Sequence, residues 1–256
     1  MLLAVDIGNT ETVMGVFREE DLAWHWRLST VPERTADELA LLFGGLLEHQ
    51  DLSFDRNVTG VVVSSVVPQA TQAVRDMVDR YFGFPAVIVE PGVKTGVSVL
   101  TDNPKEVGAD RIVNALAAHQ RFGGPAIVVD FGTATTFDAV SEDGAYLGGV
   151  IAPGLQISAA ALYRETARLP RVELVAPGSV IGKNTVESVQ SGLIYGYAAL
   201  VDGMVERMAK DLGEPTVVAT GGLAEVVIGE CTTIDHHEPW LTLEGLRLVY
   251  ERNAAR

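Results

Sequence analysis

The alternation of apolar and polar residues at the start of the chain predicts a β-hairpin, a third strand and then a helix. Strand-like apolar segments lie at residues 2–5, 12–17, 23–28 and 58–63. Polar residues and a glycine separate the first two segments, as in a hairpin turn. Apolar residues recur at i, i+3 and i+4 from Thr35 to Glu48, which indicates a helix face, and a second helix is predicted over 69–81.

The second half of the chain repeats this order. Its strand-like segments lie at residues 126–129, 137–140, 145–150 and 216–219, and its helical segments at 155–167 and 185–210. A turn at Gly221-Gly222 and a short helix follow the last strand. A helical pattern over 105–120 joins the halves. We expect an α/β protein with two lobes, an N-terminal lobe of residues 1–115 and a C-terminal lobe of residues 116–256.

Two turns of similar sequence indicate that the halves arose by duplication. Asp6-Ile7-Gly8-Asn9-Thr10 aligns with Asp130-Phe131-Gly132-Thr133-Ala134 at an offset of 124 residues, close to half of the 256-residue chain. A duplicated domain produces such an offset. Each turn joins two predicted strands, and we expect a cleft between the two turns.

Both turns are suited to the phosphates of a nucleotide. Their glycines let backbone N–H groups approach an anion. Hydrogen bonds to phosphate oxygens can come from the side chains of Asn9, Thr10, Thr133 and Thr135. For either turn alone, the alternative is an ordinary polar hairpin turn, which uses the same residue types. The repetition favours phosphate binding, although neither turn has the glycine spacing of a Walker A loop or a Rossmann fingerprint.

A charged segment between the halves holds a candidate acid–base group. Residues 102–111 place acidic and basic side chains around Gly108. Asp110 can accept a proton from a substrate hydroxyl while Arg111 pairs with an anionic group of the same substrate. The alternative is an ion pair on the surface of a helix.

Charge and composition narrow the range of partners. The chain has 34 acidic and 19 basic residues, a net charge of -15, so no basic surface for nucleic acid is predicted. The single cysteine, Cys231, cannot form an intramolecular disulfide, which fits a reducing cytoplasm. Residues 1–6 lack the basic start of a signal peptide and the length of a membrane span. We expect a cytoplasmic protein with no nucleic acid and no membrane partner.

Three further features carry weaker predictions. His236-His237 suggest a metal, but adjacent residues of an extended segment face opposite sides, which favours an exposed polar loop. Cys231 has no evident activating charge in the sequence and is expected to be inert. The turn at residues 220–222 can admit a nucleotide base or form a simple helix entry.

Taken together, the motifs resemble those of type III pantothenate kinases. In chain order they are Asp6–Thr10, Ser64–Pro68, Asn103–Pro104 with Gly108–Arg111, Asp130–Thr136, Leu147–Gly149 with Pro153–Gly154, Gly182–Thr185 and Thr220–Gly222. Each motif alone is only weak evidence for the family. Seven motifs in the family's order over nearly the whole chain are specific.

The resemblance implies a fold and a reaction. The fold is the duplicated, ribonuclease H-like two-lobe architecture of acetate and sugar kinases, Hsc70 and actin. The reaction is the ATP-dependent phosphorylation of pantothenate to 4′-phosphopantothenate, the first step of coenzyme A biosynthesis. It implies Mg²⁺ with ATP, and K⁺ or NH₄⁺ as a monovalent cofactor.

The resemblance also assigns roles to residues. ATP would be bound by Asp6, Ile7, Gly8, Asn9, Thr10, Glu11, Thr12, Val13 and Thr133. Pantothenate would be bound by Gly108, Ala109, Asp110 and Arg111, and by Thr185 from the neighbouring subunit of a homodimer. Asp110 would be the catalytic base, and Asp130 would hold the monovalent cation.

The segment from Thr185 to Lys210 indicates how such a dimer would form. Its apolar residues include Val189, Leu193, Ala199, Leu200, Met204 and Met208. One amphipathic stripe needs fewer apolar positions. We therefore expect one face of this helix to pack on its own lobe and another on the same helix of a second subunit.

One position departs from the family, and two alternatives stay open. Many members carry tyrosine where this chain has Thr101, which loses an aromatic wall but keeps a hydroxyl, so substrate affinity is affected more than reaction type. The alternatives are a catalytically silent nucleotide-binding relative with a regulatory role, and a kinase of the same fold that acts on another small hydroxy acid or sugar.

Overall fold

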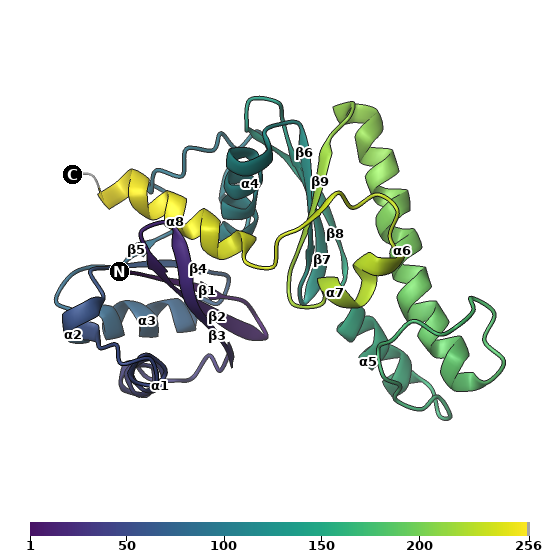
Figure 1. The fold of residues 1–256 in the computed structure, drawn as a ribbon, viewed down its shortest axis with the longest axis horizontal. Coiled ribbons are helices and arrows are strands. Elements are labelled where there is room, and N and C mark those ends of the chain that lie inside the picture. The colour runs from purple at the N-terminus through teal and green to yellow at the C-terminus, as the bar shows by residue number, and fades with distance from the viewer. Residues whose placement is uncertain (255–256) are drawn as a thin grey trace. The chain divides into compact units, whose positions relative to one another are not determined.

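The computed structural model describes residues 1–254, which form two compact units. The first unit contains residues 1–97 and 102–117 and those from Thr242 onward, and the second contains residues 98–101 and 118–241. Each unit is built on its own five-stranded sheet (Figure 1). Within the described residues, no helix is both long and apolar enough to cross a membrane.

The first sheet combines three antiparallel strands with two parallel ones. Its strands are β1 (Leu2–Ile7), β2 (Glu11–Arg18), β3 (Asp21–Ser29), β4 (Gly60–Ser65) and β5 (Val87–Ile88), in the order β3-β2-β1-β4-β5. β1, β2 and β3 are antiparallel neighbours, whereas β4 runs parallel to β1 and β5 parallel to β4. The predicted hairpin and third strand are therefore confirmed.

Helices pack on both faces of this sheet. They are α1 (Ala36–Glu48), α2 (Phe54–Asn57), α3 (Pro68–Tyr81), the first residues of α4 (Ala109–Phe122) and α8 (Leu241–Ala254), with a 3₁₀ helix, η1 (Pro104–Glu106). Alternate residues of β1, Leu3, Val5 and Ile7, join the apolar core that includes α1 and α3. The opposite face carries Asp6, and there Gly60 lies against the ring of Tyr250 from α8.

The second sheet repeats the topology of the first. Its strands are β6 (Ala126–Phe131), β7 (Ala134–Val140), β8 (Tyr146–Pro153), β9 (Thr216–Thr220) and β10 (His236–His237), in the order β8-β7-β6-β9-β10. Again three strands are antiparallel, and the next two are parallel. Asp6 and Asp130 are each the second-last residue of the central strand. This matching topology supports the predicted duplication.

Besides the last residues of α4, the second unit has helices that cover one face of its sheet. They are α5 (Leu155–Glu165), α6 (Thr185–Leu212) and α7 (Ala224–Val227), with a 3₁₀ helix, η2 (Ile228–Glu230). Alternate residues of β6, Ile127, Val129 and Phe131, pack in one core with residues of α5 and α6. Asp130 therefore faces the other side of the sheet, as Asp6 does in the first unit.

Three examples show where the structure differs from the sequence prediction. The predicted helix over 105–120 starts only at Ala109, because η1 ends at Glu106 and Val107 has an extended backbone. His236-His237 form the edge strand β10 rather than a loop, since they pair with the end of β9. Helix α8 is absent from the prediction, although the structure has it on the first sheet.

Candidate active site

Asp6 lies near the end of β1, on the face opposite the core with α1 and α3. Its neighbour on the parallel strand β4 is Ser64, whose Oγ donates a hydrogen bond to Asp6 Oδ1 at 2.5 Å. Burial, followed by the charge of Asp110, raises the pKa of Asp6 to about 7, while the Ser64 hydrogen bond lowers it. Two predicted site carboxylates thus interact within the first unit. Sequence reasoning singled out the motif of Ser64 but gave it no role.

Asp110 stands in the first turn of α4. Its Oδ1 accepts a hydrogen bond from the backbone N–H of Arg111 at 2.8 Å. Burial raises the pKa of Asp110, and the backbone N–H and charge of Arg111 oppose the rise. A side chain at position 108 would overlap the Asp110 carboxylate, which explains the glycine there. Asp110 is therefore a desolvated carboxylate, and a raised pKa suits a general base.

The tip of the first turn is polar and exposed. Asn9, Thr10 and Glu11 are all exposed. The backbone N–H of Gly8 donates to the carbonyl of Glu11 at 2.9 Å and closes the turn. A Cβ at position 8 would lie 3.1 Å from that carbonyl, so glycine keeps the turn tight. Such a turn presents backbone and side-chain donors to an anion.

The remaining predicted ATP residues of this turn face inward. Ile7 belongs to the apolar core. Thr12 is buried, and its hydroxyl lies 2.9 Å from that of Thr30. Val13 is partly buried on β2. The side chains of Ile7 and Thr12 therefore cannot reach a phosphate, and only their backbone is available to one.

The second turn gives Asp130 the surroundings that Asp6 has in the first. On the parallel strand β9, Thr220 is the neighbour of Asp130, just as Ser64 is the neighbour of Asp6. Both hydroxyl residues are buried, with Thr220 only 1% exposed. Each sheet thus sets a buried hydroxyl residue beside the carboxylate at the end of its central strand.

Thr133 and Thr135 have opposite orientations. Thr133 is exposed at the tip of the second turn, where Gly132 N–H donates to the carbonyl of Ala134 at 3.0 Å. Thr135 is 1% exposed and pairs with Phe131, so it lies on the core face of the sheet. The prediction that Thr135 donates to a phosphate is wrong, whereas the position of Thr133 fits that role.

The surroundings of Asp130 fit a monovalent cation. Gly221 has a left-handed φ of +94°, and a side chain there would overlap Asp130 Oδ1. A Cβ at Gly132 would lie 3.6 Å from the same oxygen. One carboxylate among side-chain-free backbone offers the mixed oxygen ligands that K⁺ takes. Within residues 1–254, no cluster of three or more His, Cys, Asp or Glu forms an alternative metal site.

The weaker candidates have structural explanations. The ring of His236 stacks on Phe122, with 4.3 Å between the ring centroids. Burial, followed by the charges of Asp202 and Glu230, raises the pKa of Cys231 to about 12. A thiol with such a pKa stays protonated at neutral pH and is a poor nucleophile, as the sequence predicts.

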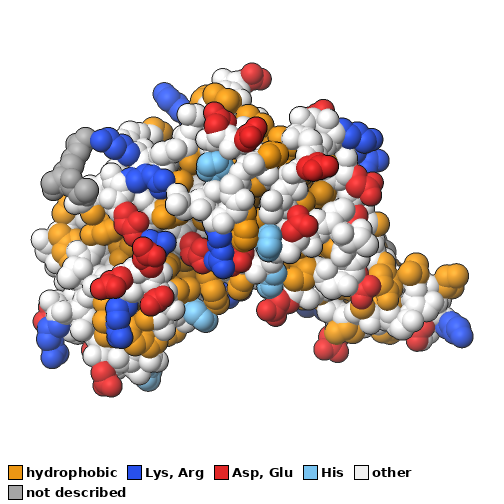
Figure 2. All heavy atoms as spheres, turned by 45° about the horizontal axis from the view of Figure 1, so that its top comes forward, with side chains coloured by type: hydrophobic (Ala, Val, Ile, Leu, Met, Phe, Trp, Pro, Cys, Tyr) orange, Lys and Arg blue, Asp and Glu red, His pale blue; other side chains and the backbone are white. Residues whose placement is uncertain are grey.

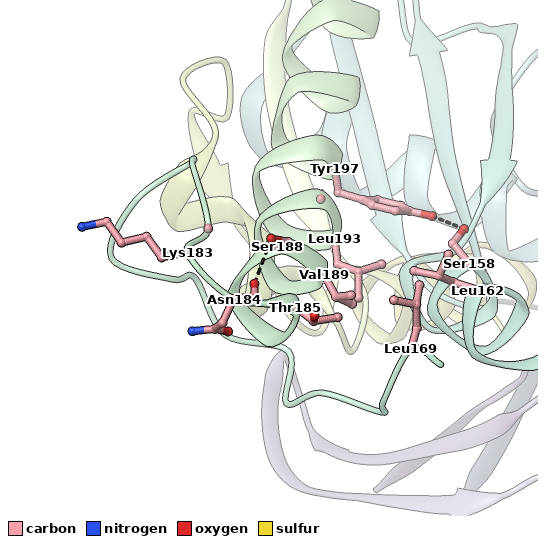
Figure 3. A pocket seen from close by; sticks show the side chains of 12 residues that line it. Ser158, Leu162, Leu169, Lys183, Asn184, Thr185, Ser188, Val189, Leu193 and Tyr197 are labelled. Atoms are coloured by element: carbon pink, nitrogen blue, oxygen red, sulfur yellow. Dashed lines mark hydrogen bonds between the residues drawn. The ribbon is translucent and has the colours of Figure 1, made fainter. Parts of the chain in front are cut away.

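Thr185 begins α6 at the edge of a pocket in the second unit. The pocket has a volume of about 730 Å³ and is open to solvent. Its apolar lining includes Leu162 and Leu193 (Figure 3). At the end away from Thr185, the hydroxyls of Ser158 and Tyr197 form a hydrogen bond. An exposed Thr185 beside an apolar pocket is a surface that a second molecule can cover.

Comparison with known proteins agrees with the resemblance. A family model described as type III pantothenate kinase matches residues 2–207. A protein named type III pantothenate kinase from Streptomyces coelicolor is 58% identical over 100% of both chains. Its namesake from Thermobifida fusca is 56% identical over 99% of this chain and 100% of its own. That from Exiguobacterium sp. is 51% identical over 99% of each chain.

Solved structures share the fold at low sequence identity. Component A of (R)-2-hydroxyglutaryl-CoA dehydratase from Acidaminococcus fermentans has a TM-score of 0.60 at 14% identity, over 100% of this chain and 99% of its own. An ROK family glucokinase from Streptomyces griseus has a TM-score of 0.54 at 14% identity, over 96% of this chain and 97% of its own. These neighbours and the repeated sheet confirm the predicted actin-like ATPase fold. With the family match and relatives more than half identical along its length, the chain belongs to the type III pantothenate kinase family.

Proposed function

We infer that this chain carries out its family's reaction, the ATP-dependent phosphorylation of pantothenate to 4′-phosphopantothenate, with Asp110 as the general base. The observation that carries the assignment of the base is the desolvated Asp110 carboxylate at the start of α4. It interacts with Asp6 of the phosphate turn in the same unit. A proton acceptor is thereby held near a turn suited to the nucleotide.

Asp110 and Arg111 act on different groups of pantothenate in this proposal. Asp110 accepts the proton of the primary hydroxyl as that oxygen attacks the γ-phosphorus of ATP and the bond to ADP breaks. Arg111 pairs with the pantothenate carboxylate, and Gly108 and Ala109 complete this side of the site. Little covalent chemistry is required, because positioning and charge neutralisation carry phosphoryl transfer.

The two turns bind ATP in this proposal. Residues 6–13 contact the phosphates from the first unit, and Thr133 contacts them from the second. The family's kinase activity implies ATP with a divalent metal. We further propose that Asp130 holds K⁺ or NH₄⁺, which would supply positive charge to a chain with a net charge of -15.

A homodimer is proposed, and the surface of the second unit supports it. Ile151 of β8 and Ile157 of α5 are 66% and 47% exposed, and Ile181, just before α6, is 81% exposed. Hydrophobic side chains are also visible at the right-hand end of Figure 2, where α5 and the start of α6 lie. Exposed apolar surface of this kind is typical of a contact with another chain.

The outer face of α6 supports the same contact with different residues from those the sequence pattern suggested. Val189 and Leu193 are buried in their own unit, and Leu200, Met204 and Met208 pack against the same core. In the middle of the helix, between residues 189 and 205, the exposed positions are Gly192, Gly196 and Ala199. Such small residues let a second helix approach closely. In the dimer that we propose, Thr185 enters the pantothenate site of the partner subunit.

Two further expectations stay proposals. We place the protein in the cytoplasm, because its family makes a coenzyme A precursor and its single cysteine forms no intramolecular disulfide. We also keep the division of the sequence into an N-terminal lobe of residues 1–115 and a C-terminal lobe of residues 116–256 as a proposal, although the residues from Thr242 onward belong to the first compact unit.

A single assay separates the proposed reaction from its alternatives. ADP release is followed in potassium buffer with Mg²⁺ and ATP, with pantothenate present or absent. The proposed kinase releases ADP only with pantothenate and makes an equal amount of 4′-phosphopantothenate. A silent relative releases none. A kinase for another hydroxy acid ignores pantothenate but responds to its own substrate in a panel of small hydroxy acids and sugars.

A further inference from the structure

We propose that Ser64 is a positioning residue for phosphoryl transfer, because its hydroxyl fixes the orientation of the Asp6 carboxylate beside Asp110. The inference rests on the function proposed above, in which Asp110 is the base and Asp6 belongs to the phosphate turn. It gives a role to the Ser64–Pro68 motif, which the proposed function leaves without one.

The strand pairing brings the two residues together. β4 runs parallel to β1, with Ser64 as the register partner of Asp6. Val61 and Val63 of β4 belong to the core with α1 and α3, so alternation turns Ser64 to the other face. Ser64 has no exposed surface, and its hydroxyl donates to Asp6 Oδ1 at 2.5 Å. Because water cannot reach it, this donor is committed to Asp6.

The hydrogen bond from Ser64 counters the repulsion between two acidic side chains at this site. Asp6 and Asp110 are two desolvated acids that interact, and like charges in one place repel. A carboxylate without a fixed donor can rotate under that repulsion. The Ser64 hydroxyl holds one oxygen of Asp6 and counters the effect of Asp110. The remaining oxygen then has a defined direction. A fixed charge near the reacting groups needs no reorganisation during the transfer.

The second sheet repeats the strand pairing, with a buried hydroxyl residue as the register partner of a carboxylate. Thr220 is the register partner of Asp130, and it is 1% exposed. On the antiparallel side, the partners of the two carboxylates differ, with Val13 beside Asp6 and Thr136 beside Asp130. A hydroxyl residue therefore occurs in both halves only on the parallel strand. We infer that the hydroxyl residue is there to pair with the carboxylate, and that it is not a local feature of strand β4.

Ser65 provides a matched control. It follows Ser64 on the same strand, and its hydroxyl donates to the carbonyl of Val67 at 3.2 Å and accepts from the N–H of Val67 at 3.1 Å. It stabilises the backbone turn that leads into α3 at Pro68. Ser65→Ala thus removes a hydroxyl from the same strand without touching Asp6.

The test compares steady-state kinetics of Ser64→Ala, Ser64→Thr and Ser65→Ala in the full chain with ATP and pantothenate. Loss of a buried hydrogen bond to a charged group predicts a kcat for Ser64→Ala roughly 10- to 100-fold below the wild type. KM for both substrates should stay within about twofold, because no substrate contact is removed. Ser64→Thr, which keeps the hydroxyl, should have most of the wild-type kcat. Ser65→Ala should have a kcat equal to that of the wild type.

Other outcomes would overturn the proposal. They are a wild-type kcat in Ser64→Ala, an equal loss in Ser65→Ala, or an effect confined to KM. If Ser64→Ala does not fold, Ser64→Cys replaces it, because cysteine has a similar volume but is a weaker hydrogen-bond donor. The kcat of Ser64→Cys must then be well below that of Ser64→Thr.

A readout independent of turnover separates this proposal from the proposed function. In ¹³C NMR of carboxyl-labelled protein, Ser64→Ala should raise the titration midpoint of Asp6 by at least about half a pH unit, and Ser65→Ala should not. A wild type that fails to phosphorylate pantothenate contradicts the function, and the NMR result then decides the role of Ser64. An unchanged Asp6 midpoint contradicts the role of Ser64 even in an active enzyme.

Discussion

At the scale of single residues, the site is an arrangement of two acids whose environments differ. Asp110 has a backbone N–H and the charge of Arg111 to favour its ionised form. Asp6 has the hydroxyl of Ser64 and the unfavourable charge of Asp110. Both acids are desolvated, so small changes in their hydrogen bonds have large effects on their charge. Substitutions that remove a charge but keep the shape of the side chain test each one separately.

Replacing Asp110 by asparagine should slow phosphoryl transfer but leave nucleotide binding unchanged. Without a proton acceptor, kcat should fall roughly 10²-fold or more, in the range that general-base removal costs. Binding of ATP, measured by equilibrium titration, should stay near that of the wild type. Asp102→Asn is the control, since Asp102 is an exposed acid of the same segment. An Asp110→Asn enzyme that keeps most of its turnover would remove Asp110 from the mechanism.

Replacing Asp6 by asparagine should stabilise the protein, and the gain should depend on pH. The pKa of Asp6 is about 7 in the folded chain against 3.8 for a free side chain. Between these values the folded chain keeps a proton that the unfolded chain has released, so this group lowers the free energy of unfolding as pH rises. Asparagine does not titrate, and it keeps an acceptor for Ser64.

Denaturant unfolding without nucleotide, from pH 4 to pH 8, measures this effect. The free energy of unfolding of Asp6→Asn minus that of the wild type should grow through the window and level off above pH 7. Its rise is at most about 4 kcal/mol, for a pKa change of about three units. A difference that stays constant over the whole range would contradict the raised pKa of Asp6.

At the scale of elements, the two hairpins show how a small difference in length redirects side chains. Ile7 pairs with Thr12 in the first hairpin, and Phe131 pairs with Thr135 in the second. The second connection is thus one residue shorter. Thr135 therefore takes the buried place of Thr12, although the aligned sequences match it with exposed Glu11. Strand alternation decides this orientation, and a motif alone does not show it.

The second hairpin should also make the enzyme selective among monovalent cations. If Asp130 and the backbone around Gly221 hold the ion, activity should be high in K⁺ or NH₄⁺ and largely absent in Na⁺, whose smaller radius requires shorter ligand distances. Rates are measured in the three chloride salts at constant ionic strength. Asp130→Asn should abolish the difference between salts. Equal wild-type rates in all three salts would count against a cation site.

The elements divide into those that the sequence reveals and those that it does not. Long periodic segments such as α3 and α6 were predictable to within a few residues, because their apolar faces are continuous. The strands β5 and β10 have only two residues each, which is too short for any period. Their existence depends on pairing with a longer neighbour.

The site was predictable in its motifs but not in its contacts. The glycine turn and Asp110 were recognisable from residue type and order. The contact between Asp6 and Ser64 requires β1 and β4 to pair in parallel, and these residues are far apart in sequence. The same holds for the closeness of Gly221 to Asp130. Local patterns carry no information on such long-range pairs, so only the folded chain reveals them.

At the scale of the whole molecule, the proposed dimer makes a prediction about mixtures of inactive chains. The Asp110→Asn chain still carries an intact Thr185, and the Thr185→Ala chain still carries an intact Asp110. If each site takes its base from one subunit and Thr185 from the other, a mixed dimer contains one intact site. An equal mixture with free exchange should therefore reach about a quarter of the wild-type activity.

Subunit exchange must be shown separately, by mass spectrometry of differently labelled chains. The control mixes Asp110→Asn with wild type, which measures the effect of exchange alone. Sedimentation that finds an active monomer would contradict the shared site. So would a mixture of the two variants that is no more active than the average of its parents despite proven exchange.

Helix α8 imposes an order on how the molecule is completed as it is made. This helix comes after every strand in the chain, yet its Leu243 and Tyr250 lie against Gly15 and Gly60 of the first sheet. On the ribosome, the unit that begins first is therefore finished last, after all residues of the second unit have emerged. Until α8 arrives, the part of this sheet face that holds Gly15 and Gly60 is uncovered. A chain stalled just before α8 is thus a natural target for chaperones and proteases.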